Sequence, residues 1–358
     1  MSDPNNQPTN VGNASTNEVD VSDPDFHFPS VLRATVGYDR ELPWQNMTFT
    51  TEVIFAATNY DVYWENLNIV PTGETFFDGR PLFGREDSSF RDVINMTNTR
   101  DGRQTNLLFK VQRRYADNWM AQGSYIYGHS TVVNDGLSSQ ARSNWRFNYT
   151  GSNPNDPEVG PSVFSPGHRI NLTVAYDIPV STTAVRLSFF YDGQQGRPYS
   201  STFSRDVNGD FESQDLLTIL TSDDVVVTGG TDAEWDAYIA NDEGLASNIG
   251  QIVPRNESRA PWRNFSDFRA AIDVPIAATN VEFSFDIRNL FNLLNSDWGR
   301  IEYANFNEIS PVRYRGIDGA SGMPIYELQF AAQNPDRKFT TDDLRSRWQM
   351  RFGARVTF

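Results

Sequence analysis

The feature that most constrains the fold is an alternation of apolar and polar residues at the C-terminus. From residue 348 to residue 358 every second side chain is apolar, and the positions between hold Gln349, Arg351, Gly353, Arg355 and Thr357. A period of two sends successive side chains to opposite faces of a β-strand. One face of this strand is therefore expected to be apolar, formed by Trp348, Met350, Phe352, Ala354, Val356 and Phe358.

The same period recurs along the chain. In 281–288 large apolar residues alternate with charged or hydroxyl side chains, and 170–178 repeats the pattern. A transmembrane β-strand has this sequence pattern, because its lipid-facing residues alternate with polar residues on the other face. The alternation predicts nine strands, near 31–39, 47–64, 93–114, 119–131, 168–178, 184–200, 266–275, 280–298 and 346–358.

The connections between these strands alternate in length. Short ones cover 41–45, 116–118, 179–183 and 275–279, and long ones, rich in Gly, Asn, Asp, Ser and Pro, cover 65–92, 132–167, 201–265 and 299–345. Outer-membrane barrels have short periplasmic turns and long extracellular loops. The pattern therefore favours an all-β fold, an antiparallel transmembrane β-barrel. A soluble β-sandwich is the alternative, although it has no reason to place every long loop at one end.

Composition excludes several functions. The 358 residues carry a net charge of −16, three His and no Cys, so disulfides, thiol nucleophiles and Cys-zinc sites are excluded. Nucleic acid is not an expected partner, because binding phosphates requires a basic surface. The acidic pairs Asp223-Asp224 and Asp342-Asp343 lie in expected loops, where neighbouring carboxylates point apart into water. We expect no enzyme activity and no catalytic residues.

The odd number of predicted strands suggests that the chain is part of a larger barrel. Single-chain bacterial barrels usually have an even number of strands, and a ninth strand ending in the periplasm would put Met1 outside the cell. The N-terminus also has neither the basic nor the apolar region of an export signal. We expect residues 1–30 to be an irregular extracellular segment and 31–358 to be the C-terminal portion of a larger barrel, or a mis-started reading frame. A hairpin near Val312–Phe330 would instead complete a ten-stranded barrel.

Four sequence runs carry a resemblance to a known family. DIRNLFN at 286–292 resembles the penultimate-strand motif of TonB-dependent outer-membrane receptors, and the terminal Phe358 resembles the signal for barrel assembly. Three runs resemble the Oar-like branch of that family: RNESRAPW at 255–262, NLFNLLNSDWG at 289–299 and SRWQMRFG at 346–353. These matches occur in order and span much of the chain.

The resemblance implies a 22-stranded barrel that is closed by an N-terminal plug and takes up a scarce ligand with energy from TonB. This chain would supply about the last nine strands, without signal peptide or plug. The implied partners are outer-membrane lipid and lipopolysaccharide, the missing plug, the TonB complex through the plug, and the assembly machinery through the strand ending at Phe358. The implied location is the outer membrane of a Gram-negative bacterium. An adhesion barrel without active transport is the alternative, and the ligand-binding residues are unknown.

One loop suggests a metal. In DVNGD at 206–210, the oxygen-bearing side chains Asp206, Asn208 and Asp210 alternate around a Gly, with Glu212 and Asp215 beyond. Ca²⁺ binds such oxygens. The match is incomplete, since Phe211 stands where a Gly is usual and the twelfth position lacks a carboxylate. The loop 206–215 is therefore either a Ca²⁺ site or a solvated acidic loop; no other cofactor is expected.

Two further sets follow from the alternation. Charged residues on the polar strand faces would line the lumen and meet either a plug or trapped water: Glu282, Asp286, Arg288, Arg351, Arg355, Asp177, Arg269, Asp273, Lys110 and Arg33. Aromatic residues near strand ends would form interfacial girdles or pack across strands: Trp44, Tyr63, Trp64, Trp119, Tyr125, Tyr127, Tyr191, Trp298 and Trp348.

Overall fold

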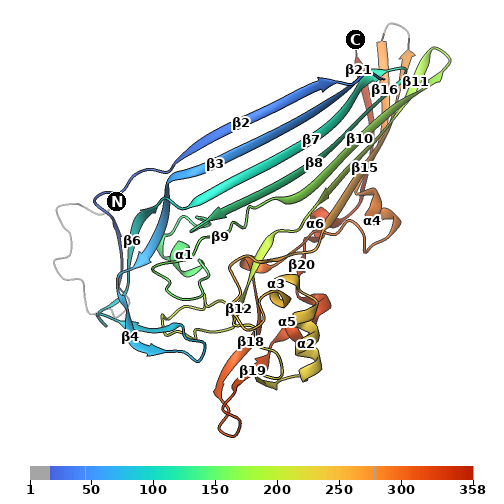
Figure 1. Cartoon of the computed structure of the whole chain (residues 1–358). Coiled ribbons are helices and arrows are strands. Elements are labelled where there is room, and N and C mark those ends of the chain that lie inside the picture. Colours follow the sequence, from blue (N-terminus) through green and yellow to red (C-terminus); the bar gives the residue numbers. More distant parts are fainter. Residues whose placement is uncertain (1–16, 45, 277–278, 358) are drawn as a thin grey trace, which may run out of the picture.

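A computed structural model of the protein describes residues 17–44, 46–276 and 279–357. The largest part of the fold is one long sheet of twelve strands (Figure 1). Nine long strands follow one another in antiparallel order along it, each hydrogen-bonded to the next. They are β2 (Ser30–Glu41), β3 (Met47–Asn66), β7 (Gly102–Ala116), β8 (Trp119–Val132), β10 (Gly167–Val180), β11 (Thr183–Gln194), β15 (Arg263–Ile276), β16 (Thr279–Arg288) and β21 (Gln349–Thr357).

These nine strands confirm the nine that alternation predicts, with three differences in extent. The range 93–114 is two strands, because β3 pairs with β6 (Phe90–Thr99) in its second half and with β7 in its first. The range 184–200 ends at Gln194, because the chain leaves the sheet at Gly196, where a Cβ would lie 2.0 Å from the Ala260 carbonyl oxygen. The range 280–298 ends at Arg288, because Asn289 adopts a left-handed φ of 53°.

The predicted alternation of short and long connections is also confirmed. The four predicted short connections join neighbouring strands at one end of the sheet, which we call the turn end, and the long ones leave from the other, the loop end (Figure 1). In the turn between β7 and β8, Asp117 and Asn118 have φ of 50° and 67°. Asp and Asn tolerate this conformation, and it matches the twist of a hairpin. Arg113 donates to the carbonyls of Ala116 and Trp119, both at 2.6 Å.

One face of the sheet is apolar across many strands. The strand registers align one continuous row on this face, Ala121, Val174, Phe189, Phe268, Ile287 and Met350. This face is not covered by a second sheet, since Phe352, Val36 and Leu32 are 79%, 73% and 71% exposed. A soluble β-sandwich would bury such a face, whereas a membrane barrel presents it to lipid.

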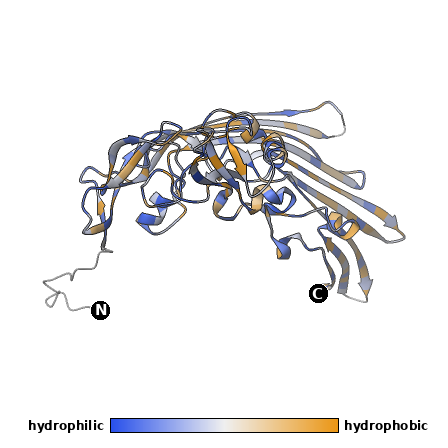
Figure 2. Ribbon diagram, turned by 90° about the horizontal axis from the view of Figure 1, so that it is seen from below, coloured by the Kyte–Doolittle hydropathy of each residue, from blue (hydrophilic) through white to orange (hydrophobic). Residues whose placement is uncertain are grey.

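The opposite face is polar and curves inward. Figure 2 shows the sheet as an arc, with most of the helices and loops gathered on its concave side. On the polar face Ala56 is buried, and a Cβ at Gly128 would lie 2.8 Å from the ring of Pro166, which belongs to the connection before β10. The polar face is therefore the concave one, and in a barrel it lines the lumen.

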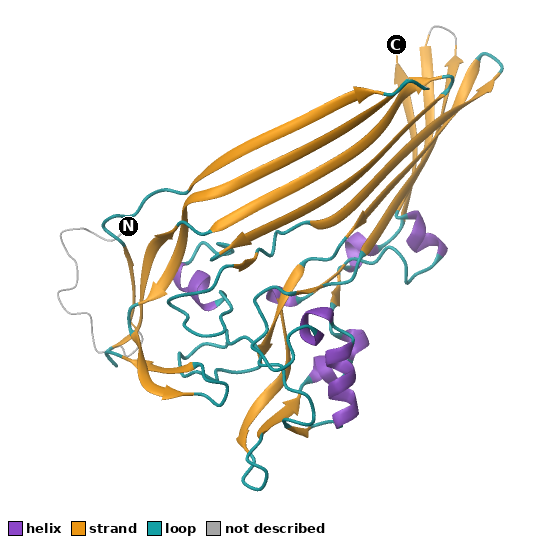
Figure 3. Cartoon of the chain, viewed as in Figure 1, coloured by secondary structure: helices purple, strands orange, loops and turns teal. Residues whose placement is uncertain are grey.

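A unit with its own five-stranded sheet, which we call the loop domain, is built mainly from the two longest connections. Its sheet has the order β13 (Val226–Thr228), β19 (Pro324–Leu328), β18 (Glu308–Ile317), β12 (Pro198–Phe203) and β14 (Ser258–Arg259). The helices α2 (Asp232–Ala240), α3 (Glu243–Ala246) and α5 (Phe330–Gln333) gather beside it (Figure 3). Its core buries Trp235, Tyr326, Leu217, Ile219 and Leu245 completely. The hairpin considered near Val312–Phe330 exists as β18–β19, but it lies in this sheet and adds no strand to the barrel sheet.

Shorter elements complete the loop end. Within the segment expected to be irregular, β1 (Asn17–Ser22) pairs in parallel with β6. The hairpin of β4 (Ile69–Thr75) and β5 (Pro81–Arg85) projects beside it. The others are α1 (Ala141–Arg146), β9 (Gly160–Pro161), α4 (Leu290–Leu294), β17 (Glu302–Tyr303), η1 (Asn305–Asn307), η2 (Pro335–Arg337), β20 (Thr340–Thr341) and α6 (Asp343–Ser346).

The barrel sheet has two edges within the described residues. There, β2 pairs only with β3 and β21 pairs only with β16, so these two strands do not pair with each other. Phe358, expected to be part of the assembly signal, lies outside the described residues. None of the described helices has the length and apolar character needed to cross a membrane.

Candidate functional site

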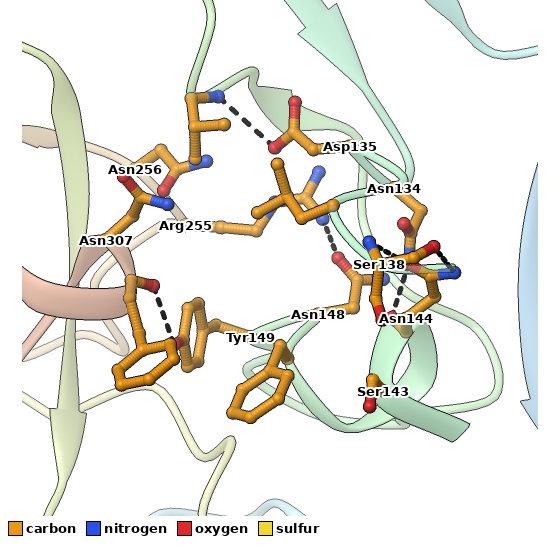
Figure 4. A pocket seen from close by; sticks show the side chains of 14 residues that line it. Asn134, Asp135, Ser138, Ser143, Asn144, Asn148, Tyr149, Arg255, Asn256 and Asn307 are labelled. Carbon is orange, nitrogen blue, oxygen red and sulfur yellow. Dashed lines mark hydrogen bonds between the residues drawn. The ribbon is translucent and has the colours of Figure 1, made fainter. Parts of the chain in front are cut away.

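A pocket of about 360 Å³ lies among three long connections at the loop end (Figure 4). The segment after β8, the residues before β14 and the residues before β18 form its walls. Five of the lining residues are asparagines and three are aromatic, whereas only Asp135 and Arg255 are charged. The asparagines are Asn134, Asn144, Asn148, Asn256 and Asn307, and the aromatic residues are Phe147, Tyr149 and Phe306.

The two charged residues are already engaged by the protein. Arg255 donates to the carbonyls of Val132 and Val133 and to the side chain of Asn148, so it ties the end of β8 to the wall of the pocket. Burial lowers the pKa of its guanidinium. Asp135 accepts from the hydroxyl of Ser162 and from a backbone N–H at 3.2 Å. Both charged groups are therefore held by the protein itself, and among the described atoms the buried Nε of Arg255 is the one nitrogen of that side chain without a hydrogen-bond partner.

Amide side chains shape the wall by bonding to the backbone. Asn144 accepts from the N–H of Ser138 and donates to its carbonyl, both at 2.8 Å. Asn134 donates to the carbonyl of Asn144 at 2.8 Å, and Asn256 donates to that of Pro161 at 2.7 Å. An irregular loop needs such partners, because buried backbone groups without hydrogen bonds are costly.

The aromatic part of the pocket is held in a strained conformation. Phe147 and Phe306 stack at 5.7 Å with planes 9° apart, and the hydroxyl of Tyr149 donates to the carbonyl of Phe306 at 3.1 Å. Phe306 and Asn307 have φ of 53° and 57°, a region that side chains other than Gly rarely adopt. Phe306 is nonetheless 73% exposed. Such strain at an exposed aromatic residue is a feature that clusters at binding sites.

The pocket can therefore bind an uncharged polar molecule that has a flat apolar face. Stacking would come from Phe147 and Phe306, and hydrogen bonds from amides. Sequence reasoning missed these residues. Arg255 and Asn256 belong to the run RNESRAPW, but the run indicated only a family resemblance, and no period or spacing connects 134–149 with 306–307.

The structure brings the predicted metal residues into one tight loop. Asp206 accepts backbone N–H groups from Asn208, Gly209 and Phe211 at 3.1, 2.7 and 2.9 Å. Asn208 accepts from the N–H of Asp210 at 2.9 Å. Within the described part of the chain, no three His, Asp or Glu side chains are arranged to hold a metal ion. The calcium prediction therefore remains a prediction.

The loop is buried more deeply than a solvated acidic loop would be. Asp210 and Asp215 are each 1% exposed. Burial raises the pKa of the Asp210 carboxyl to about 7, and Asp206 adds repulsion in the same direction. Burial and the neighbouring Asp210 raise the pKa of Asp215 as well. Asp215 makes its cation contact with Arg80, at 3.4 Å.

The charged residues predicted to share the lumen face do so. The strand registers place all ten on the polar face, from Arg33 on β2 to Arg355 on β21. Arg269 bridges Asp286 and Glu282, each at 2.9 Å, and Arg351 bridges Asp286 at 3.0 Å from the next strand. The result is a ladder of alternating charge across three strands.

The aromatic residues divide between the two interpretations. Trp44 is exposed at the turn end, and Trp298 and Trp348 are exposed at the loop end, as girdles would be. The short helix α4 places Phe291 against Tyr191 of the apolar face, with ring centroids 6.0 Å apart. Trp64, in contrast, packs inside a small core with buried partners.

The comparison with known families identifies the class of protein. Residues 2–301 match the family described as outer membrane beta barrel domain. The match spans most of the chain, and the protein therefore belongs to this family and is located in the bacterial outer membrane. No curated protein matches the sequence. The family match does not single out the TonB-dependent, Oar-like branch or the number of strands in the full barrel.

Proposed function

We propose that the protein is the barrel of a TonB-dependent receptor of the Oar-like kind, which takes up a ligand across the outer membrane. The loop-end pocket captures the ligand. A plug inside the barrel then rearranges under the pull of the TonB complex, and the ligand passes along the polar face. The protein does no chemistry on the ligand, and it remains embedded in outer-membrane lipid and lipopolysaccharide through its apolar face.

The observation that carries the proposal is the charge ladder of Arg269, Asp286 and Arg351 on the concave face. These side chains pair with one another and leave further hydrogen-bonding capacity toward the lumen. A plug needs such a surface, because it must be held firmly and released again. The loop domain over the same end supports the proposal, since a ligand entering the lumen would pass the pocket.

The second candidate is an adhesion barrel without active transport. The loop domain has its own core, around Trp235 and Tyr326, and a rigid, well-folded surface unit suits contact with a matrix or another cell. Adhesion requires the loop domain but neither a plug that moves nor energy from TonB.

A single cysteine distinguishes the two candidates, because the chain has none of its own. Ser284→Cys places a thiol on the polar face beside the ladder, and Asp223→Cys places a control thiol on an exposed loop. Labelling by a membrane-impermeant maleimide is measured in cells with and without functional TonB. The transport proposal predicts that labelling at position 284 depends on TonB while labelling at 223 does not. Equal labelling at 284 in both strains would favour adhesion.

A further inference from the structure

The acidic loop holds more buried negative charge than its cation neutralises. Asp206, Asp210 and Asp215 come together there, and Asp78 approaches from the turn between β4 and β5. Among the described residues, Arg80 is the guanidinium that reaches these four carboxylates, whereas Arg142 and Arg146 pair with the neighbouring Glu212. Buried carboxylates without a matching cation are unfavourable, so they either take up protons or bind a cation.

Arg80 is committed mainly to Asp78. It holds that carboxylate through Nε at 2.9 Å and through a second nitrogen at 2.7 Å, and it also donates to the carbonyl of Leu216 at 2.8 Å. Its approach to Asp215 is longer, at 3.4 Å. The partners of Asp210 are uncharged N–H groups, those of Gln214, Asn208 and the Glu212 backbone. The charges of Asp210 and Asp215 are therefore largely uncompensated.

A neutral side chain beside them points independently to a missing positive partner. Gln214 is completely buried, and its Oε1 has no hydrogen-bond partner among the described atoms. Its Nε2 donates to Asp210 at 2.9 Å, which sets the amide directly against the carboxylates. A buried carbonyl oxygen without a donor is unusual in native proteins. A hard cation would satisfy this oxygen and the carboxylates together.

The backbone removes one objection that the sequence raised. Phe211 stands where calcium loops usually have Gly, yet its φ is 72°, so the chain makes the left-handed turn in spite of the side chain. The ring of Phe211 stays outside the loop, under the guanidinium of Arg85 at 3.9 Å. Asp215, which follows Asp206 by nine residues, supplies a carboxylate in place of the one missing from the twelfth position.

We propose that the loop 206–215 is a Ca²⁺ site whose ligands are oxygens of Asp206, Asn208, Asp210, Gln214 and Asp215. Three of these five side chains are carboxylates and two are amides. Asp206 and Asp210 accept backbone N–H groups of their own loop, which holds these two carboxylates in place. Ca²⁺ tolerates irregular sets of six to eight oxygens, so carbonyls and water complete the shell.

The site would fix the shape of the ligand pocket. The carbonyl of Asn208 accepts from the N–H of Phe83 on β5 at 2.7 Å. On the other side, Thr150 donates to the carbonyl of Gln214 and accepts from the N–H of Leu216, at 3.1 and 3.0 Å. Thr150 follows Tyr149, which lines the pocket. Bound Ca²⁺ would therefore hold the β4–β5 hairpin and one wall of the pocket in place.

The test is calorimetric titration of CaCl₂ into the chelator-treated protein in detergent, together with proteolysis of the loop. We expect saturable binding and Ca²⁺-dependent protection of 206–218. Asp210→Asn and Asp215→Asn should each weaken binding by on the order of tenfold, because ligand charge sets affinity in such sites. Asp223→Asn, which makes the same change on an exposed part of the same connection, should leave the affinity unchanged.

The titration of the wild-type protein tests the Ca²⁺ proposal even if a variant fails to fold. Failure of a variant to fold would be detected as a change in the heat-dependent mobility of the barrel on gels. Absence of both binding heat and protection at millimolar Ca²⁺ would overturn the proposal. Equal affinities for wild type, Asp210→Asn and Asp215→Asn would overturn it as well, since the ion would then bind elsewhere.

Discussion

Replacement of Arg80 by Met should destabilise the loop domain more than any other single loss of charge at the loop end. The Arg80 side chain is fully buried, and it joins the β4–β5 hairpin to Asp215 and to Leu216 and Thr218 of the loop domain. Its guanidinium also lies 5.7 and 5.5 Å from the rings of Phe76 and Phe203. Methionine keeps an unbranched apolar stem but leaves Asp78 and Asp215 without a cation.

The expected loss is about 3–5 kcal/mol, the range found when one partner of a buried ion pair is removed. Arg315→Met is the matched control. Arg315 pairs with Glu327 at 2.7 Å, but its side chain is 42% exposed, and exposed pairs contribute at most about 1 kcal/mol.

The assay is native-state hydrogen exchange of the loop domain, measured with chelator present, because local opening free energies report on one cooperative unit without requiring the barrel to unfold. We expect the opening free energy of the α2 and β18 amides to fall by several kcal/mol in Arg80→Met and to change little in Arg315→Met. Similar losses in the two variants would refute the reasoning, since buried and exposed pairs would then be equivalent.

Three other predictions follow from the same geometry. Because the pKa of Asp210 is raised to about 7 in the folded protein, the native state binds more protons than the unfolded state between about pH 4 and pH 7. In the presence of chelator, the free energy of unfolding of the loop domain should therefore fall by up to about 4 kcal/mol as pH rises through that window. Thermal melts at several pH values measure this loss. Phe306→Ala should reduce ligand uptake while leaving the melting temperature nearly unchanged, because the ring is mostly exposed; an unchanged uptake rate would remove Phe306 from the site. Phe283→Arg, in the middle of β16 on the apolar face, should cost about 2–4 kcal/mol and lower the amount of assembled barrel, whereas Ser284→Arg on the polar face should be tolerated; equal assembly of both would contradict the assignment of faces.

The barrel strands could be predicted from sequence because lipid on one side imposes a period of two. That period specifies both the strand and the direction of every side chain, so Arg33 and Arg355 could be assigned to one face before their partners were known. The strand limits were less predictable. Asn289 ends β16 by a left-handed turn, and the apolar residues after it form the short helix α4.

The loop domain could not be predicted in the same way, because its contacts join segments far apart in sequence. β12 pairs with β18 across more than a hundred residues, and the register contains an irregularity. The pocket depends on these pairings, since Phe147 meets Phe306 only after the loop domain has folded. The acidic loop was visible in the sequence because its oxygens are local. Its burial and its link to Arg80 were not, because they depend on a hairpin more than a hundred residues earlier.

The most direct test of the membrane-barrel assignment is a spin-label scan along β16. The chain has no Cys, so single cysteines at positions 281 to 287 give one label each. Collisions with oxygen, which is concentrated in lipid, and with a water-soluble nickel chelate are measured in outer-membrane vesicles. The fold predicts that positions 281, 283, 285 and 287 favour oxygen and that 282, 284 and 286 favour the nickel chelate. A profile without this alternation, or with its phase reversed, would contradict the account.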